Sequence, residues 1–137
     1  MKNRIYADTN LFIRLFTNSP PEQAEKSKIF LRQVVSGNYE LFVCDLIIAE
    51  IVYVLDSLYS LNRREIVEKI IAIAEIDNTV LENRLIILSA LNLYEKNNID
   101  FVDAYLASHA KKNGCDQIVT FDKDFKKLDF IKQINPE

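Results

Sequence analysis

Ile5-Tyr6-Ala7-Asp8-Thr9-Asn10-Leu11-Phe12-Ile13 is the stretch that decides the fold class of this chain. A short apolar run ends in one carboxylate, two small polar residues follow, and a second apolar run begins with helical spacing. The pattern predicts a strand, a turn and a helix. Ligands of open α/β sheets bind outside the carboxyl ends of the strands, so Asp8 is a candidate site residue. The alternative is that Asp8 or Asn10 only caps the helix, because both residue types are favoured caps.

Length and composition limit the class of protein. The chain has 137 residues, of which 49% are hydrophobic and 27% charged, with two glycines and three prolines. Such a chain is too apolar to be disordered and long enough to bury a core, so we expect one domain over residues 1–137. The net charge of −3 provides no global basic field. An anionic partner therefore needs local lysines or a bound cation.

Cysteine content and hydropathy indicate the compartment. Cys44 and Cys115 are too few for a disulfide framework or a zinc site, so we expect reduced, largely buried thiols. The N-terminus leads directly into the first strand, and no apolar run approaches the ~20 residues of a membrane span. The sequence therefore predicts a cytoplasmic protein with no membrane contact.

Hydrophobic periodicity predicts strands that alternate with helices. The strand candidates are short apolar runs without polar alternation, which is typical of a parallel sheet covered on both faces. We expect an α/β fold with a parallel sheet of four to five strands sandwiched between helices in three layers. The predicted strands cover 4–8, 39–44, 76–81, 117–120 and 130–134, and the predicted helices cover 9–16, 20–35, 46–58, 62–74, 83–94 and 100–113, with a helical turn at 122–128.

Glu50 is the most informative single residue. It is the only charge in the run Leu46–Leu55, whose helix Asp45 is expected to cap. A buried carboxylate is costly unless it is paired or binds a metal, so we expect Glu50 to be buried for a functional reason. The alternative is that Glu50 faces solvent or pairs with a cation such as Arg14.

Further acids lie in similar apolar settings. Asp103 follows the expected cap Asp100 by three residues, where the helix dipole alone would favour an acid. Asp122 and Asp124 directly follow the apolar strand candidate 117–120. If the fold brings Asp8, Glu50, Asp103 and Asp122 together, their four carboxylates would repel one another unless cations neutralised them. Oxygen-only ligands select Mg²⁺ or Mn²⁺, and such ions support phosphoryl chemistry.

Four segments together resemble the motifs of the PIN-domain ribonucleases, in the order of that family. These segments are Tyr6–Asn10, Cys44–Glu50, Phe101–Ala107 and Val119–Phe125. The resemblance implies a single PIN-like domain and a Mg²⁺- or Mn²⁺-dependent endoribonuclease. Carried over, the acidic catalytic and metal-site residues would be Asp8, Glu50, Asp103 and Asp122, with Thr9, Asn10, Thr120 and Asp124 in supporting positions.

The size of the chain is also similar to that of VapC-type toxins, which are often dimeric and are inhibited by a small antitoxin. The resemblance therefore implies an RNA substrate, an antitoxin partner and a homodimer. The apolar helix that contains Glu50 and the next helix, after Asn62, could form the groove for an antitoxin segment or for a second copy. The alternative is that both helices are simply buried in the core.

Substrate phosphates would need local positive charge. Arg14, four residues after Asn10, is a candidate phosphate clamp, and Lys123 is a second possible substrate-binding residue. Further lysines flank the last two motifs, namely Lys111, Lys112, Lys126 and Lys127. The alternative for these lysines is an ordinary solvated surface.

Three other functions remain open at this point. One is a stand-alone PIN nuclease of RNA processing, and another is a PIN-like scaffold that only binds partners. A third is an aspartyl-phosphate phosphatase with Asp8 as the nucleophile. The pattern of those phosphatases requires acid at position 10 and threonine at position 12, where this chain has Asn10 and Phe12.

Overall fold

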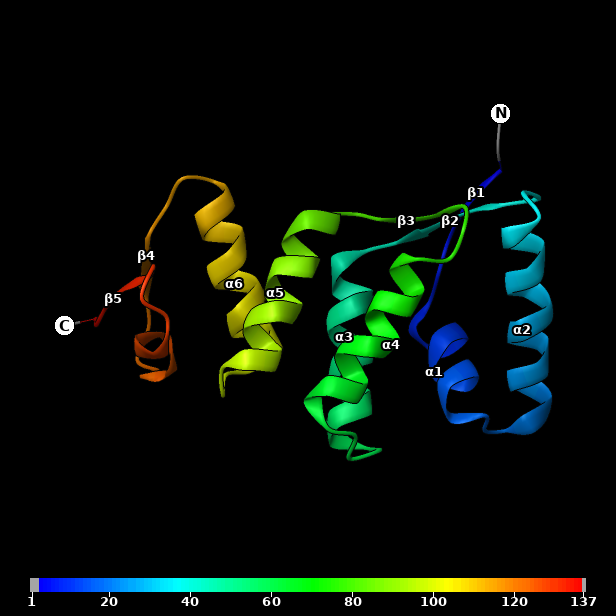
Figure 1. The fold of residues 1–137 in the computed structure, drawn as a ribbon, viewed down its shortest axis with the longest axis horizontal. Coiled ribbons are helices and arrows are strands. Elements are labelled where there is room, and N and C mark those ends of the chain that lie inside the picture. The colour runs from blue at the N-terminus through cyan, green and yellow to red at the C-terminus, as the bar shows by residue number, and fades with distance from the viewer. Residues whose placement is uncertain (1–2, 137) are drawn as a thin grey trace. The chain divides into compact units, whose positions relative to one another are not determined.

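The computed structural model describes residues 3–136, which form two compact units divided after Arg84 (Figure 1). The first unit contains a parallel sheet with the strand order β1-β2-β3. In the register of this sheet, Ile5 lies opposite Leu41, and Phe42 lies opposite Val80. Its elements are β1 (Arg4–Tyr6), α1 (Thr9–Thr17), α2 (Pro21–Val35), β2 (Glu40–Val43), α3 (Asp45–Ser57), α4 (Arg63–Ala74) and β3 (Thr79–Leu81).

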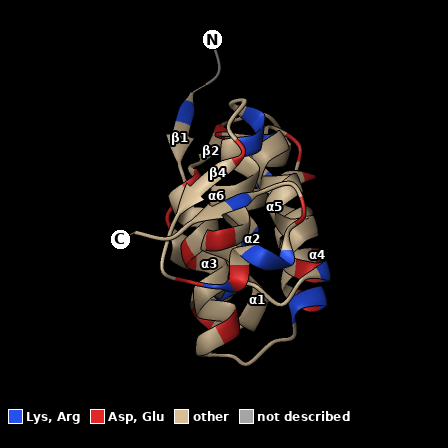
Figure 2. Cartoon of the chain, turned by 90° about the vertical axis from the view of Figure 1, so that its left-hand side faces the viewer, with Lys and Arg blue, Asp and Glu red and all other residues tan. Residues whose placement is uncertain are grey.

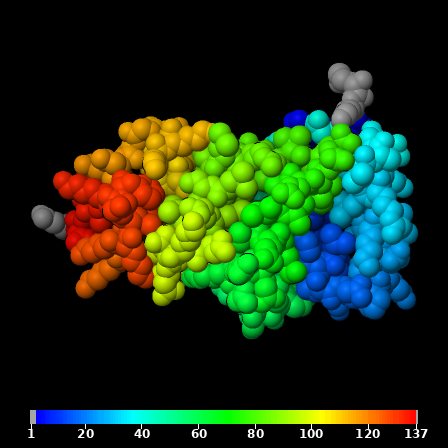
Figure 3. Space-filling model, viewed as in Figure 1, coloured from blue at the N-terminus to red at the C-terminus, as the bar shows by residue number. Residues whose placement is uncertain are grey.

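Apolar stripes on the helices form the core of the first unit. Helix α1 packs against α2 and α3, and α3 packs against α4. In Figure 3 the atoms of α2, in light blue, form an outer strip beside those of α1. The exposed side of α4 carries both signs of charge, as Figure 2 shows, and includes an ion pair between Arg64 and Glu68. The fully buried side chains of this core are Phe12, Leu41, Ile48, Ile51, Leu55, Ile66, Ile70 and Ile73.

The second unit pairs two helices with a small parallel sheet. Its elements are α5 (Arg84–Lys96), α6 (Phe101–Lys112), β4 (Gln117–Val119), the short 3₁₀ helix η1 (Asp124–Lys127) and β5 (Lys132–Ile134). Helix α6 ends before Gly114, whose φ of +77° is the left-handed conformation that favours glycine at this position. Phe125 and Leu128 are buried and anchor the segment between the two strands.

The predicted α/β class is confirmed, with parallel strands and helices close to the predicted ranges. The five strands within residues 3–136 form two sheets rather than the single sheet that the sequence suggested, because β4 and β5 pair with each other. Both cysteines are free as expected, but the expectation of burial was wrong, since Cys44 is half-buried and Cys115 is exposed. None of the helices in the described part of the chain is long and apolar enough to cross a membrane.

The sequence predicted that Asp45 caps α3. This prediction was wrong, because Cys44 occupies the N-cap position. The nearly buried carboxylate of Asp45 instead accepts hydrogen bonds from the backbone N–H of Asn83, at 3.2 Å, and from its side-chain amide, at 2.8 Å. The backbone N–H of Asp45 donates to the carboxylate of Glu82 at 2.9 Å. This reciprocal clamp joins the turn after β2 to the turn after β3.

Replacing Asp45 by alanine should lower the free energy of unfolding by about 1–3 kcal/mol, because the partly buried donors of Asn83 lose their acceptor. Urea denaturation would measure the change. Asp56→Ala, at an exposed position of the same helix, is the matched control and should change the stability by less than about 0.5 kcal/mol. Equal effects of the two substitutions would contradict a clamp role for Asp45.

Candidate metal centre

Three carboxylates converge in the second unit. One oxygen from each of Asp103, Asp122 and Asp124 can be chosen so that the three atoms lie within 4.8 Å of one another. Two oxygens bound to one Mg²⁺ at 2.0–2.1 Å are separated by at most about 4.2 Å, so small side-chain rotations would bring this set to coordination distance. The sequence predicted Asp103 and Asp122 as ligands and Asp124 as a supporting residue, whereas the structure places all three together.

Backbone geometry holds two of these acids in place. Thr120 follows β4, and its hydroxyl oxygen accepts a hydrogen bond from the backbone N–H of Asp122 at 2.9 Å. The carboxylate of Asp122 in turn accepts from the backbone N–H of Asp124 at 2.9 Å. Thr120 therefore lies where a supporting residue was expected, and its contact is with the backbone of the acidic segment.

Lys127 links the segment that contains Asp122 and Asp124 to the turn between α5 and α6. Its ammonium group lies 3.1 Å from a carboxylate oxygen of Asp124 and donates a hydrogen bond to the backbone carbonyl of Asn98 at 2.6 Å. The i,i+3 spacing of Asp124 and Lys127 was a sequence signal for this ion pair. The sequence contained no signal for the contact with Asn98, because the two residues are distant in the chain.

The electrostatic environment of Asp103 is unfavourable for its charge. Partial burial raises the pKa of Asp103 above its ordinary value of 3.8, and the nearby charges of Asp122, Asp100 and Asp124 raise it further. Asp103 lies in the first turn of α6, where the helix dipole favours an anion. Desolvation and like-charge repulsion outweigh that effect. A bound cation would remove this unfavourable energy.

Asp8 lies at the carboxyl end of β1 and occupies the N-cap position of α1. Its carboxylate accepts a hydrogen bond from the backbone N–H of Thr9 at 2.7 Å, so the helix-capping interpretation is confirmed as at least part of its role. Asn10 is exposed, while Thr9 is 3% exposed. The hydroxyl of Thr9 has no hydrogen-bond partner among the described residues. A catalytic or metal-binding role for Asp8, with Thr9 and Asn10 as supporting residues, stays a prediction.

The expected burial of Glu50 was wrong, because its side chain is exposed. Helix α3 buries the opposite stripe, which includes Ile48, Ile51 and Leu55. Leu46 and Tyr53 share the exposed face with Glu50 and are 76% and 67% exposed. The physical reason is that a helix apolar on both sides needs only one side to complete the core of this unit. The metal role of Glu50 stays a prediction.

The predicted substrate-binding cations lie on different elements. Arg14 is half-buried near the end of α1 and donates to the side-chain oxygen of Gln23 on α2 at 2.7 Å. Lys123 is exposed and lies between Asp122 and Asp124 in sequence. Lys123 is therefore adjacent to the acidic cluster, and Arg14 belongs to the first unit.

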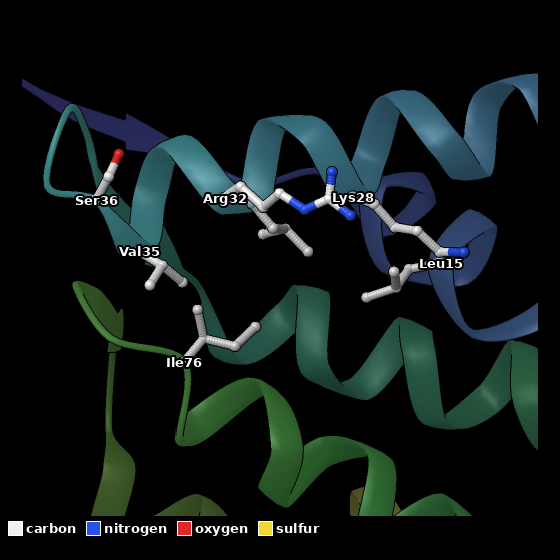
Figure 4. A pocket seen from close by; sticks show the side chains of 7 residues that line it. Leu15, Lys28, Arg32, Val35, Ser36 and Ile76 are labelled. Carbon is white, nitrogen blue, oxygen red and sulfur yellow. The ribbon is translucent and has the colours of Figure 1, made fainter.

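An apolar groove of about 420 Å³ lies on the first unit (Figure 4). Its position differs from the one predicted between the helix of Glu50 and the next helix, because the groove follows α1, α2 and the segment after α4. Figure 4 shows Val35 and Ile76 on opposite sides, Leu15 at one end and the cationic side chains of Lys28 and Arg32 along α2. Lys28 and Arg32 are four residues apart and therefore share one face of α2.

The raised pKa of Asp103 has a consequence for stability. Above pH 3.8 the folded protein binds more protons at Asp103 than the unfolded chain does, so metal-free stability falls as the pH rises through the shifted pKa. Asp103→Asn should therefore be more stable than the parent at neutral pH in EDTA, and the difference should vanish below pH 3.8. Thermal melts across pH would measure this, with exposed Glu95→Gln on α5 as the control. If the parent were more stable than Asp103→Asn at pH 7 in EDTA, the inferred repulsion at Asp103 would be contradicted.

Comparisons with known proteins identify the family of the chain. The family model described as PIN domain matches residues 5–131, which include every segment quoted for the resemblance. The chain is also similar to a VapC ribonuclease of Aquifex aeolicus (strain VF5), with 32% identity over 121 residues that cover 88% of this chain and 89% of the relative. A match of this extent leaves no large part of the chain outside the family pattern. The chain belongs to the PIN-domain family.

Proposed function

We propose that this protein is a cytoplasmic endoribonuclease that depends on Mg²⁺ or Mn²⁺ and is the toxin of a toxin–antitoxin pair. The observation that carries the proposal is the convergence of Asp103, Asp122 and Asp124. The membership in the PIN-domain family and the similarity to a VapC ribonuclease support it. A single PIN-like domain over residues 1–137 and additional ligands Asp8 and Glu50 are part of the same proposal.

The donor set of the cluster fits a hard divalent ion. All three groups offer carboxylate oxygens, and Lys127 is paired with one member, Asp124. An oxygen-only set selects Mg²⁺ or Mn²⁺ over zinc. When bound, such an ion holds a phosphodiester, lowers the pKa of a water and stabilises the leaving oxygen.

The residues of the chain have separate tasks in this proposal. Asp103 projects from the first turn of the rigid helix α6, while Asp122 and Asp124 project from the segment after β4. The hydrogen bonds of Thr120 and of the Asp124 backbone fix the second element, so the carboxylates need little rearrangement to bind. Lys123 and Arg14 would contact substrate phosphates as positive charges.

Neutral isosteres of the acids test the nuclease. Asp103→Asn and Asp122→Asn should each lower metal-dependent cleavage of a fluorescent RNA by at least about 100-fold, because coordination and charge neutralisation are lost together. Asp8→Asn and Glu50→Gln should do the same if those residues complete the site. Mn²⁺ should raise the Tm of the parent and should not raise that of Asp122→Asn. Exposed Asp129→Asn is the control.

Undiminished cleavage by well-folded Asp103→Asn and Asp122→Asn proteins would exclude this site. Absence of any Mn²⁺ effect on the parent Tm, together with absence of RNA cleavage, would favour a PIN-like scaffold that only binds partners.

The antitoxin is proposed to dock in the groove between α1, α2 and Ile76. The floor of this groove is apolar, and Lys28 and Arg32 provide positive charge along one side. These features fit an amphipathic helix that presents an apolar stripe and acidic residues. A homodimer is also proposed, since Leu46, Tyr53 and Leu58 leave apolar surface exposed near α3.

Charge reversal tests the docking site. Lys28→Glu combined with Arg32→Glu should weaken binding of the product of a neighbouring short reading frame by at least about tenfold and leave RNA cleavage by the isolated protein unchanged. The measurement is titration calorimetry with the purified pair. Arg63→Glu combined with Arg64→Glu, on α4, is the control with the same change in charge. Equal losses from both pairs would indicate a general charge effect and exclude a specific groove.

A further inference from the structure

A second cavity, of about 280 Å³, lies on the second unit between the beginning of α5 and the end of α6. Its apolar side is formed by Leu85 and Ile86, and the hydroxyls of Ser89 and Ser108 lie 3.1 Å apart within it. The two remaining lining residues are Lys111 and Lys112. None of these six lining residues, all from the described part of the chain, is acidic.

The charge of this cavity is opposite to that of the protein as a whole. The chain carries a net charge of −3, yet two adjacent lysines face the same hollow. Neither Lys111 nor Lys112 forms an ion pair with any residue that the structure describes. The ammonium group of Lys111 lies 4.8 Å from the ring centroid of Phe130, which restricts its side chain. The lining of the cavity therefore carries positive charge that no described acid neutralises through an ion pair.

Helix dipoles do not set the sign of this site, because α5 begins and α6 ends beside it and their contributions oppose one another. The lysines determine the charge, and the hydroxyls add neutral hydrogen-bonding groups. The Ser89 hydroxyl donates its hydrogen to Ser108, so the serine pair leaves one O–H, that of Ser108, to donate to a ligand. Two ammonium groups and this hydroxyl are a donor set suited to a single phosphate group.

Helix α6 joins this cavity to the candidate metal centre. Asp103 and Lys111 lie eight residues apart on α6, which corresponds to about 12 Å along the helix axis. A phosphate at the lysines is therefore too distant to be the phosphate that reacts at Asp103. It would belong to another nucleotide of the same strand.

We propose that Lys111, Lys112, Ser89 and Ser108 form a subsite for a non-reacting phosphodiester group of single-stranded RNA. This inference rests on the proposed ribonuclease function. The subsite holds the strand by its backbone, so it favours substrates longer than a dinucleotide and does not select a base sequence. The rigid helix between the two sites sets the distance from the held phosphate to the bond that is cut.

The test is RNA binding in the absence of cleavage. A fluorescein-labelled 12-nucleotide RNA is titrated with the Asp122→Asn protein in EDTA, and anisotropy gives the Kd at several salt concentrations. Adding Lys111→Gln and Lys112→Gln should weaken binding up to about tenfold. The slope of log K against log salt should become shallower by about 0.7, as expected for one lost phosphate contact of a single strand.

A matched variant separates the site from general charge. Lys126→Gln combined with Lys132→Gln removes two other exposed lysines of the same unit and should change Kd by less than twofold. Ser89→Asp places a carboxylate in the cavity and should weaken binding at least as much as Lys111→Gln with Lys112→Gln. Thermal melts verify that each variant folds.

Three outcomes would overturn the subsite: equal losses from both lysine pairs, no loss from Lys111→Gln with Lys112→Gln, or no RNA binding by the Asp122→Asn protein. The nuclease proposal fails differently. If the parent binds RNA through these lysines but does not cleave it with Mg²⁺ or Mn²⁺, the subsite stands and the catalytic assignment is wrong.

Discussion

The strands of this protein are three or four residues long, so parallel pairing alone supplies few hydrogen bonds, and each sheet depends on apolar helix side chains packed around it. The same parallel pairing brings the carboxyl ends of neighbouring strands to one edge. The hydrogen bonds from the turn after β2 to the turn after β3 are direct evidence of this in the first unit. Polar residues that follow one strand can therefore contact polar residues that follow the neighbouring strand.

Acidic side chains have two different environments in this structure. Asp45 is nearly buried, and Asn83 provides its carboxylate with two donors, so it stabilises the fold. Asp103 instead has acidic neighbours, which together with burial raise its pKa. The difference lies in the partners of each carboxylate. A satisfied acid holds two turns together, whereas a repelled group of acids is suited to bind a cation.

Much of the fold was predictable because helices and strands have different periods. The stripes of α2 and α4 and the short strand runs predicted these elements within a few residues, and Asn62 caps α4 as its sequence position indicates. Periodicity could not decide which side of α3 faces the core, because both sides are apolar. Glu50 was therefore expected to be buried and is exposed.

By itself, the sequence determined the α/β class, the order of the elements and the family motifs, because these depend on local spacing and on residue type. Only the tertiary structure decided which acids lie together. It added Asp124 to Asp103 and Asp122, and it paired Lys127 with Asp124 and with the carbonyl of Asn98. It also placed Lys111 and Lys112 beside two serines. Such contacts join residues from separate elements, and their distances depend on how those elements pack.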